Sequence, residues 1–232
     1  METQTGKVAV TRAATILFQI ALLVCLRSQA QAQRADDPQR DTQIWPDTTV
    51  TIKLRPDISF IIHGTARFGR DSSALVNEQA GAGFSKSFGR NFSAGIFYRF
   101  INSEPTPNRR SGEHRIFLDL TPRKSLGKGF TLQDRNRIEW RDVNKRTSWR
   151  YRNRLQFERP ISINERKITP YFAVEPMYDT RFRAWSRTQM YIGTRIPLIK
   201  HVTFDGFYMR QFDARTRPGF LNVVGAYWRL EF

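Results

Sequence analysis

Apolar and polar side chains alternate with period two through most of the chain after residue 43, which is typical of strands with one polar and one apolar face. The clearest segment is 149–158, in which Trp149, Tyr151, Leu155 and Phe157 alternate with arginine, glutamine and glutamate. Turn residues separate segments of this kind, and no helix of ten or more residues is predicted after residue 32. The pattern predicts eleven strands, at 48–54, 58–68, 75–86, 92–102, 113–121, 131–141, 149–158, 168–179, 186–196, 202–211 and 220–232.

Strand length separates two all-β architectures that would both alternate in this way. Strands of soluble proteins average about five to six residues, whereas a tilted strand that crosses a bilayer needs about 9 to 11. Most of the predicted strands have the length of membrane-crossing strands. We therefore predict a transmembrane, antiparallel, up-and-down β-barrel, with the polar faces toward the lumen and the apolar faces toward lipid. A soluble periplasmic β-sandwich that binds a ligand is the alternative.

The number of strands is a check on this prediction. Single-chain bacterial barrels have an even number of strands and keep both termini in the periplasm, whereas the pattern gives eleven. We expect about twelve strands, with ten as the alternative. Either a strand is missed within residues 38–47, where Pro46 interrupts a suitable run, or one predicted segment elsewhere is wrongly split in two.

The first 32 residues resemble a cleaved secretory signal peptide. Lys7 and Arg12 precede a mostly apolar stretch, residues 13–26, which is too short to span a bilayer as a helix. Ala30 and Ala32 provide the small residues that a signal peptidase requires before the cleavage site. The expected organisation is a signal peptide at 1–32, an N-terminal periplasmic segment at 33–42 and a barrel domain at 43–232, located in the bacterial outer membrane.

The C-terminus supports the same location. Trp228, Leu230 and Phe232 alternate with polar or small residues, and the chain ends on the aromatic ring of Phe232. This end resembles the C-terminal signal of bacterial outer-membrane proteins, although Tyr227 stands where a glycine is usual. The resemblance implies that the barrel-assembly machinery binds this strand during biogenesis. Outer-membrane lipid is the other expected partner.

The chain is strongly basic, with a formal net charge of +17. Cleavage after Ala32 would leave 35 basic and 20 acidic residues, and 28 of the basic residues would be arginines. Such a charge alone suggests nucleic acid as a partner. An exported protein does not meet the genome, however, and the basic and aromatic residues already fit the alternation of the strands. We therefore expect no nucleic-acid partner.

The arginines gather with carboxylates on the predicted inward faces. If strands 131–141 and 149–158 pair as a hairpin, Glu139 lies opposite Arg150, Arg152 or Arg154 in three neighbouring registers. We also expect Glu175 and Asp179 to lie within reach of the arginines of the following strand. The predicted lumen charge lattice consists of Arg135, Arg137, Glu139, Arg150, Arg152, Arg154, Glu158, Glu175, Asp179, Arg187 and Arg195.

Two functions are compatible with such a lattice. If the charges neutralise one another, the lattice fills the lumen and the barrel is a structural protein of the envelope. If surplus positive charge is open to water, the barrel is a narrow channel that prefers small anionic solutes. The sequence leaves both readings open.

An outer-membrane enzyme that modifies lipid is the rival class of function. Ser111, Glu113 and His114 are close in sequence and His201 follows a strand, but they form no recognisable catalytic triad. We therefore predict no enzymatic activity and no catalytic residues. The three histidines lack the spacing of a metal motif, and the only cysteine lies in the predicted leader, so no metal or cofactor is expected.

Several segments together resemble a bacterial family known only as a domain of unknown function, whose members are predicted outer-membrane barrels. The resemblance extends over essentially the whole mature chain and implies fold and location, with no substrate or catalytic residue to carry over. The segments are Asp-Thr-Gln-Ile-Trp at 41–45, Leu-Gly-Lys-Gly-Phe-Thr-Leu at 126–132, Arg-Asn-Arg-Ile-Glu at 135–139, Ser-Trp-Arg-Tyr-Arg-Asn-Arg at 148–154, Glu-x-x-Tyr-Asp at 175–179 and Tyr-Met-Arg-Gln at 208–211.

Overall fold

The computed structural model describes residues 39–164 and 166–232, and every regular element in these ranges is a strand. All eleven predicted strands are present. In the same ranges, no helix is long and apolar enough to cross a membrane. The predicted signal peptide, residues 1–32, lies outside the described residues. The strands are β1 (Arg40–Lys53), β2 (Ile58–Gly69), β3 (Ala74–Phe88), β4 (Phe92–Ser103), β5 (Ser111–Gly127), β6 (Phe130–Val143), β7 (Arg146–Glu158), β8 (Ile161–Ile163), β9 (Arg166–Asp179), β10 (Ala184–Ile199), β11 (Val202–Asp213) and β12 (Phe220–Glu231).

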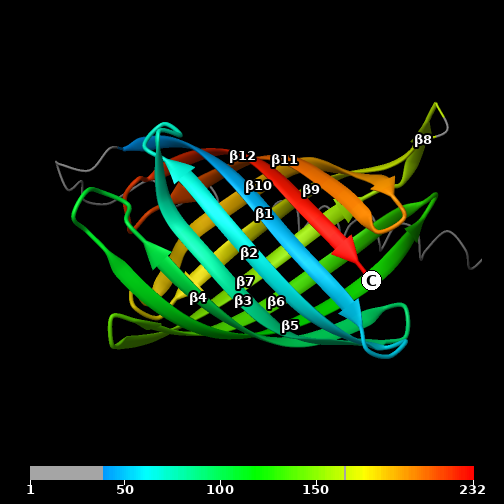
Figure 1. Ribbon diagram of the computed structural model, residues 1–232, viewed down its shortest axis with the longest axis horizontal. Coiled ribbons are helices and arrows are strands. Elements are labelled where there is room, and N and C mark those ends of the chain that lie inside the picture. Colours follow the sequence, from blue (N-terminus) through cyan, green and yellow to red (C-terminus); the bar gives the residue numbers. More distant parts are fainter. Residues whose placement is uncertain (1–38, 165) are drawn as a thin grey trace, which may run out of the picture. The chain divides into compact units, whose positions relative to one another are not determined.

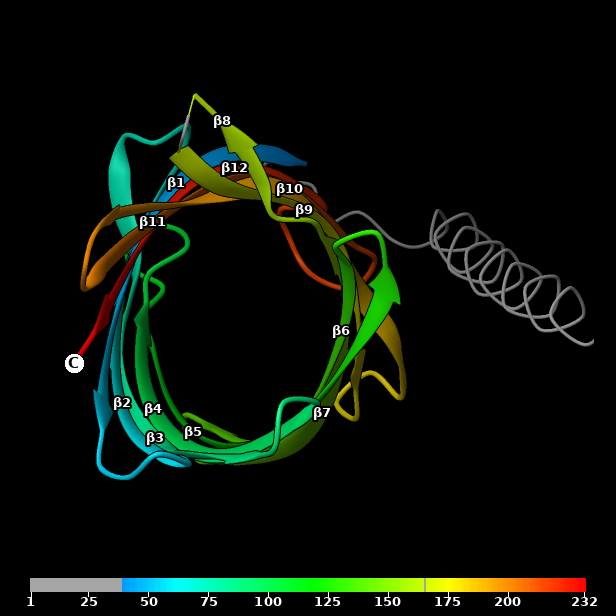
Figure 2. The same cartoon turned by 90° about the vertical axis from the view of Figure 1, so that its right-hand side faces the viewer.

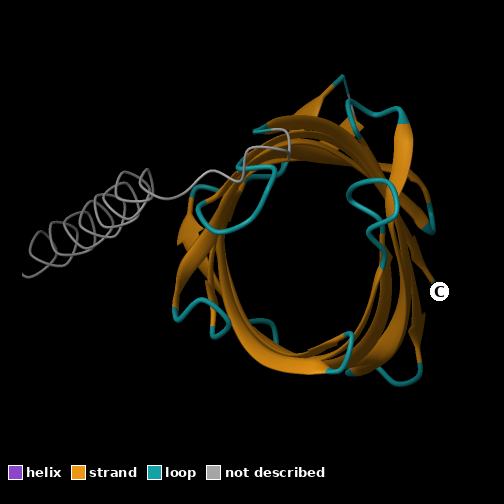
Figure 3. Ribbon diagram, turned by 90° about the vertical axis from the view of Figure 1, so that its left-hand side faces the viewer, coloured by secondary structure: helices purple, strands orange, loops and turns teal. Residues whose placement is uncertain are grey.

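The strands form one closed sheet, which confirms the predicted all-β barrel and excludes the two-layered sandwich (Figures 2 and 3). Each strand of the wall is antiparallel to the next one in sequence, and β7 pairs with β9. The ring closes where β1 lies beside β12, and these two strands run parallel over twelve residue pairs (Figure 1). The three-residue strand β8 pairs only with β9 and projects beyond the end of the wall.

The wall therefore contains eleven strands, and the twelfth strand of the fold lies outside it. The premise of an even wall is wrong for this barrel, because parallel pairing of the first and last strands closes a sheet with an odd number. No separate strand lies within residues 39–47, the described part of the predicted range; instead, β1 begins at Arg40 and continues through Pro46. The pairing of β1 with β2 skips Trp45 and Pro46, since proline has no N–H to donate, while Pro46 still lies opposite Ala226 of β12.

The distribution of side chains is the inverse of that of a soluble protein. Large apolar residues of nearly every wall strand are exposed on the outer surface; for example, Ile96 is 57% and Ile192 62% exposed. The side chains buried within the barrel include many charged ones, and Glu139, Glu175 and Asp179 are fully buried. Such a surface suits a lipid environment, because exposed apolar area of this extent is unfavourable in water.

One part of the lumen is apolar. β1 and β9–β12 direct a cluster of buried side chains inward, and Phe207 packs against it. Gly225 on β12 makes room for the Phe207 ring, because a Cβ at Gly225 would lie 2.0 Å from a ring carbon. Side chains thus fill the lumen along these strands. The cluster consists of Trp45, Tyr171, Ala173, Tyr191, Met209, Leu221 and Val223.

A polar cluster interrupts the apolar outer surface at the middle of β6 and β7. The Asn153 side chain donates a hydrogen bond of 2.5 Å to the carboxylate of Asp134. The Tyr151 hydroxyl donates one of 2.6 Å to the side-chain oxygen of Asn136. Asp134 and Asn136 are the two residues that break the apolar face in the sequence. Their partners on the neighbouring strand satisfy these polar groups on the barrel's outside.

Candidate functional site

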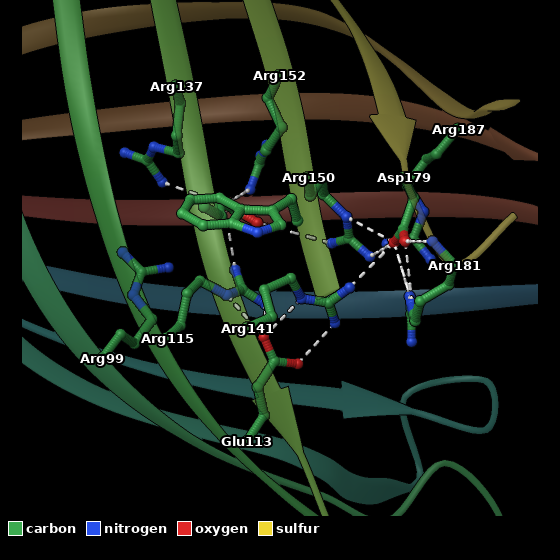
Figure 4. Close-up of polar contacts among 12 residues, drawn as sticks. Arg99, Glu113, Arg115, Arg137, Arg141, Arg150, Arg152, Asp179, Arg181 and Arg187 are labelled. Atoms are coloured by element: carbon green, nitrogen blue, oxygen red, sulfur yellow. Dashed lines mark hydrogen bonds and ion pairs between the residues drawn. The ribbon is translucent and has the colours of Figure 1, made fainter. Parts of the chain in front are cut away.

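The inward faces of β5, β6, β7 and β9 carry a continuous network of arginines and carboxylates, which we call the lumen lattice (Figure 4). These strands are neighbours in the wall, and alternate residues of each point into the barrel. The register places Glu139 opposite Arg150. The lattice consists of Glu113, Arg115, Asp119, Arg135, Arg137, Glu139, Arg141, Arg150, Arg152, Glu175, Asp179 and Arg181.

Glu139 lies at the centre of the lumen lattice and has four guanidinium groups around it. Its carboxylate is 3.2 Å from Arg152, 3.4 Å from Arg115, 3.9 Å from Arg150 and 4.0 Å from Arg137. Each of these arginines also binds another carboxylate at a shorter distance. Glu139 therefore links ion pairs that would otherwise be separate.

Asp179 ends the lattice at one mouth of the barrel. Its Oδ2 atom accepts from Arg141 at 3.0 Å, from Arg150 at 2.8 Å and from Arg181 at 2.8 Å. Arg187 also lies beside this carboxylate, without a bond to it (Figure 4). This carboxylate thus has three arginine partners, of which Arg141 also binds Glu113 and Arg150 also lies near Glu139.

The other three carboxylates of the lattice have one or two arginine partners each. Glu113 binds Arg115 at 2.6 Å and Arg141 at 2.7 Å. Glu175 binds Arg152 at 2.7 Å and Arg135 at 2.8 Å. Asp119 receives two parallel bonds of 2.6 Å from Arg137, the bidentate geometry for which the guanidinium fork is suited. In total, five carboxylates bind seven arginines.

Two arginines of the predicted lattice pair with carboxylates other than those expected. Arg187 binds Asp213 at 2.5 Å, and Arg195 binds Glu158, so neither forms an ion pair with Glu175 or Asp179. A bulge between Trp185 and Arg187 shifts the register of β10 against β9, while β11 brings Asp213 directly opposite Arg187. Arg187 and Arg195 thus pair with other carboxylates, although Arg187 still lies beside Asp179.

Three inward arginines stack on aromatic rings instead of pairing with carboxylates. The guanidinium carbon of Arg67 lies 3.8 Å from the centre of the Trp45 ring. That of Arg154 lies 4.1 Å from the centre of the Tyr191 ring, and that of Arg99 lies 5.2 Å from the centre of the Phe117 ring. Within the described residues, none of the three forms an ion pair. They add positive charge to that of the lattice.

The lattice also includes residues that the sequence prediction missed. Glu113, Arg115 and Asp119 lie at odd positions of β5, and Arg141 lies on the same face of β6 as Glu139. Extending the period-two pattern to the preceding strand would have found Glu113, Arg115 and Asp119, and Arg141 already shares the polar face of the predicted strand 131–141. Arg181 lies in the turn after β9, where no periodicity applies.

The lattice opens into a cavity of about 260 Å³ at the mouth formed by the turns after β2, β4, β6, β9 and β11. We call it the mouth cavity. Its lining contains a single carboxylate, that of Glu113, and side-chain amides from several strands. The arginines in its lining are Arg67, Arg115, Arg141, Arg150, Arg181, Arg187 and Arg217.

The residues considered for catalysis do not assemble into a site. Glu113 and His114 are consecutive in β5, so Glu113 points inward to the lattice while His114 lies outside, with its Nδ1 atom 2.7 Å from the Tyr98 hydroxyl. His201 lies 2.5 Å from the main-chain oxygen of Glu231 and stacks on Phe232. No cluster suited to a metal ion occurs within 39–164 and 166–232.

The predicted assembly signal lies at the parallel seam between β12 and β1. Leu230 pairs with Val50, and Trp228 is partly exposed on the outer surface. The terminal residue is held by main-chain bonds, since Phe232 N donates to Thr51 O at 2.9 Å and Lys53 N donates to Phe232 O at 2.8 Å. The last strand is thus bonded to β1 through its end.

The matches among solved structures include two proteins of similar extent. One is the β domain of the Bordetella autotransporter BrkA, with a TM-score of 0.46 and 12% identity, over 78% of this chain and 86% of that chain. The other is LpxR from Salmonella typhimurium, with a TM-score of 0.45 and 9% identity, over 78% of this chain and 83% of that chain. No curated protein sequence matches the chain.

The family comparison covers most of the barrel. The family described as "Protein of unknown function (DUF2490)" matches residues 42–221, from the third residue of β1 to the second residue of β12. The match spans all of the lumen lattice and the mouth cavity. The chain therefore belongs to the DUF2490 family.

Proposed function

We propose that this protein is a non-enzymatic outer-membrane β-barrel with a narrow lumen that prefers anions. Location in the outer membrane is supported by the closed sheet, whose outer surface is apolar and whose inner surface is charged. The N-terminal segment 1–32 supports export. The partners of this proposal are outer-membrane lipid, the barrel-assembly machinery and small anionic solutes.

The excess of arginine on the inward face carries the proposal. The lumen lattice has two more arginines than carboxylates. Arg67, Arg99 and Arg154 add three positive charges. Asp41 and Asp47 of β1 offset two of these charges. Three further ion pairs, such as that between Arg229 and Asp205, are neutral. The lumen thus has a net charge of about +3, which attracts anions and repels cations.

The packing of the lumen favours a narrow passage. Lattice residues such as Arg141 and Arg150 are only 5% and 7% exposed, although they point into the barrel. The apolar cluster with Trp45 and Met209 covers the facing side. An eleven-stranded wall has an interior between that of eight-stranded barrels, which side chains fill, and that of porins with 16 or more strands.

The absence of enzymatic activity is proposed from the same geometry. A catalytic Glu–His pair requires both side chains on one face, but the alternation of β5 separates Glu113 from His114. The buried carboxylates are held by arginines, which keeps them from acting as general bases.

Location and channel activity need separate tests. For location, we expect the protein in the outer-membrane fraction, and we expect its electrophoretic mobility in mild detergent to change on heating. Recovery in the soluble periplasm with unchanged mobility would refute the membrane barrel. For the channel, purified protein is reconstituted into planar bilayers under a KCl gradient, where the sign of the reversal potential reports selectivity.

We expect small conductance steps with anion preference. This preference should decrease in the double variant Arg67→Gln/Arg99→Gln, which removes two positive charges from the lumen without breaking an ion pair between described residues. The double variant Arg55→Gln/Arg90→Gln, in the exposed turns after β1 and β3, is the control with two matched charges removed. Cation preference would refute the proposal. A membrane-located protein without conductance would favour the structural function, which the extensive ion pairing of the lumen lattice also supports.

A further inference from the structure

The mouth cavity is more cationic than the rest of the lumen. Seven arginines line it, and the carboxylates bonded to these arginines are only Glu113, Glu139, Asp179 and Asp213. The seven arginines therefore outnumber the carboxylates bonded to them by three, and Asp41 and Asp47, which offset charge in the lumen as a whole, form no ion pair with these arginines within the described residues. Because the lumen restricts water on one side of the cavity, an anion bound there would interact with these charges more strongly than in bulk solvent.

Two of the seven arginines have free hydrogen-bond donors. Arg67 stacks on Trp45, and its Nε atom is buried without a hydrogen-bond partner in the described part of the chain. Arg217, in the turn between β11 and β12, forms no ion pair with any described residue. A guanidinium carries five N–H donors in one plane, so both side chains can bind a further anion without breaking an existing pair.

Two of the three arginines bonded to Asp179 also have donors to spare. Arg141 donates from all three of its nitrogens to Asp179 and Glu113. Arg150 and Arg181 each donate to Asp179 from Nε and one terminal nitrogen, so their other terminal nitrogen is not used by this carboxylate. Arg181 and Arg187 keep 34% and 25% of their side chains exposed toward the mouth. These two arginines could therefore contact a ligand that enters from solvent.

We propose that the mouth cavity binds the phosphate group of a small, water-soluble phosphate ester. A phosphate monoester presents up to three acceptor oxygens and close to two negative charges at neutral pH, which matches several guanidinium forks and the excess of arginines over bonded carboxylates. A single carboxylate would leave most of that surplus unbalanced. This assignment deepens the proposed anion-preferring lumen and rests on it.

The organic part of the ligand is polar and small. The cavity volume of about 260 Å³ lies just below the range of roughly 300–1,000 Å³ typical of small-molecule sites. Gln79, Gln189, Gln211 and Asn77 contribute side-chain amides to the lining, and an amide both donates and accepts hydrogen bonds. Such a lining suits hydroxyl groups, so the ligand class is a phosphorylated polyol or sugar.

Calorimetric titration of the detergent-solubilised, folded barrel tests the assignment, with glycerol 3-phosphate as the probe. We expect saturable binding to the wild-type protein, weaker binding of the carboxylate glycerate and no binding of glycerol. Arg67→Gln and Arg217→Gln should each lower the affinity about tenfold, the amount expected for one charge-assisted hydrogen bond. Heat-modifiable mobility of each variant verifies that the barrel is folded.

Arg55→Gln is the matched control, because it removes one positive charge from a turn at the opposite mouth. It should leave the affinity within about twofold of wild type, since a distant exposed charge is screened by salt. Equal losses in Arg55→Gln and Arg67→Gln would overturn the site, because the binding would then follow net charge alone. Glycerate binding as tight as that of glycerol 3-phosphate would overturn the choice of phosphate.

The phosphate could also belong to a lipid headgroup. Titration is therefore repeated in nanodiscs of zwitterionic and of anionic phospholipid, and equal affinity in both supports a soluble ester. Loss of binding in the anionic nanodiscs, with retention in the zwitterionic ones, would show that lipid phosphate occupies the cavity and would overturn the soluble ligand. Anion-selective conductance without glycerol 3-phosphate binding refutes the site alone, whereas binding without conductance refutes the channel alone.

Discussion

Replacement of Glu139 by glutamine tests whether the lumen lattice stabilises the barrel. Glutamine keeps the shape of the side chain and removes one negative charge from a fully buried position. Breaking a buried ion pair on one side usually costs about 3–5 kcal/mol, because the remaining charge is left without a partner. Here each arginine around Glu139 keeps a closer carboxylate, at 2.6 to 2.8 Å. We therefore expect the lower end of the range, a loss of about 3 kcal/mol in the free energy of unfolding.

The measurement is urea-induced unfolding of the protein refolded into phospholipid vesicles, followed by tryptophan fluorescence. Glu231→Gln, at the exposed end of β12, is the control and should change the free energy of unfolding by less than about 0.5 kcal/mol. If Glu139→Gln destabilises no more than this control, the lattice does not contribute to stability and the reasoning is refuted.

A double-mutant cycle sharpens the same test. Arg152 is the guanidinium nearest to Glu139, at 3.2 Å, so Glu139→Gln and Arg152→Gln should be non-additive. The double variant should lose less stability than the sum of the two single losses, because each single variant leaves a buried charge unbalanced. Strict additivity would show that the two residues act independently.

Three further outcomes are expected. Gly225→Ala should destabilise the barrel by about 1–3 kcal/mol in the same unfolding assay, because its Cβ would overlap the Phe207 ring, and Phe207→Ala should restore part of the loss. If Phe232 belongs to the assembly signal, Phe232→Ala should lower the amount of folded barrel in outer membranes, measured by heat-modifiable mobility; an unchanged amount would contradict the predicted role. The hydrogen bond from Arg110 lowers the pKa of Glu104 in the loop after β4, so Arg110→Gln should raise that pKa in an NMR titration, and an unchanged value would contradict the contact.

The sequence was sufficient to predict the strands because one physical pattern defines them all. Each strand must turn its polar side chains inward and its apolar side chains to the outer surface, so period two persists even where single residues break it. Asp134 and Asn136 break it on β6, and partners on β7 compensate them. The position of Glu139 opposite Arg150 could also be predicted, because the hairpin between β6 and β7 is short and its register is unbroken.

Features that depend on distant strands could not be predicted in this way. The parallel seam follows from the closure of the ring, which leaves no mark on the alternation within β1 or β12. The bulge at Trp185 and the pairing of Arg187 with Asp213 depend on how β10 meets both of its neighbours. The mouth cavity likewise combines strand residues with Arg181 and Arg217 from turns, where no periodicity indicates direction.

The parallel seam has a consequence for how the barrel could be rewired. Arg40 and Phe220 meet at one mouth of the barrel, whereas Thr51 and Glu231 meet at the other. The first strand therefore begins at one mouth and the last strand ends at the opposite mouth. A linker joining the two ends of the barrel domain would have to run roughly 40 Å, the length of a twelve-residue strand. In an even-stranded barrel a short loop would be enough. Circular permutation, which is simple in even barrels, is therefore obstructed here by geometry.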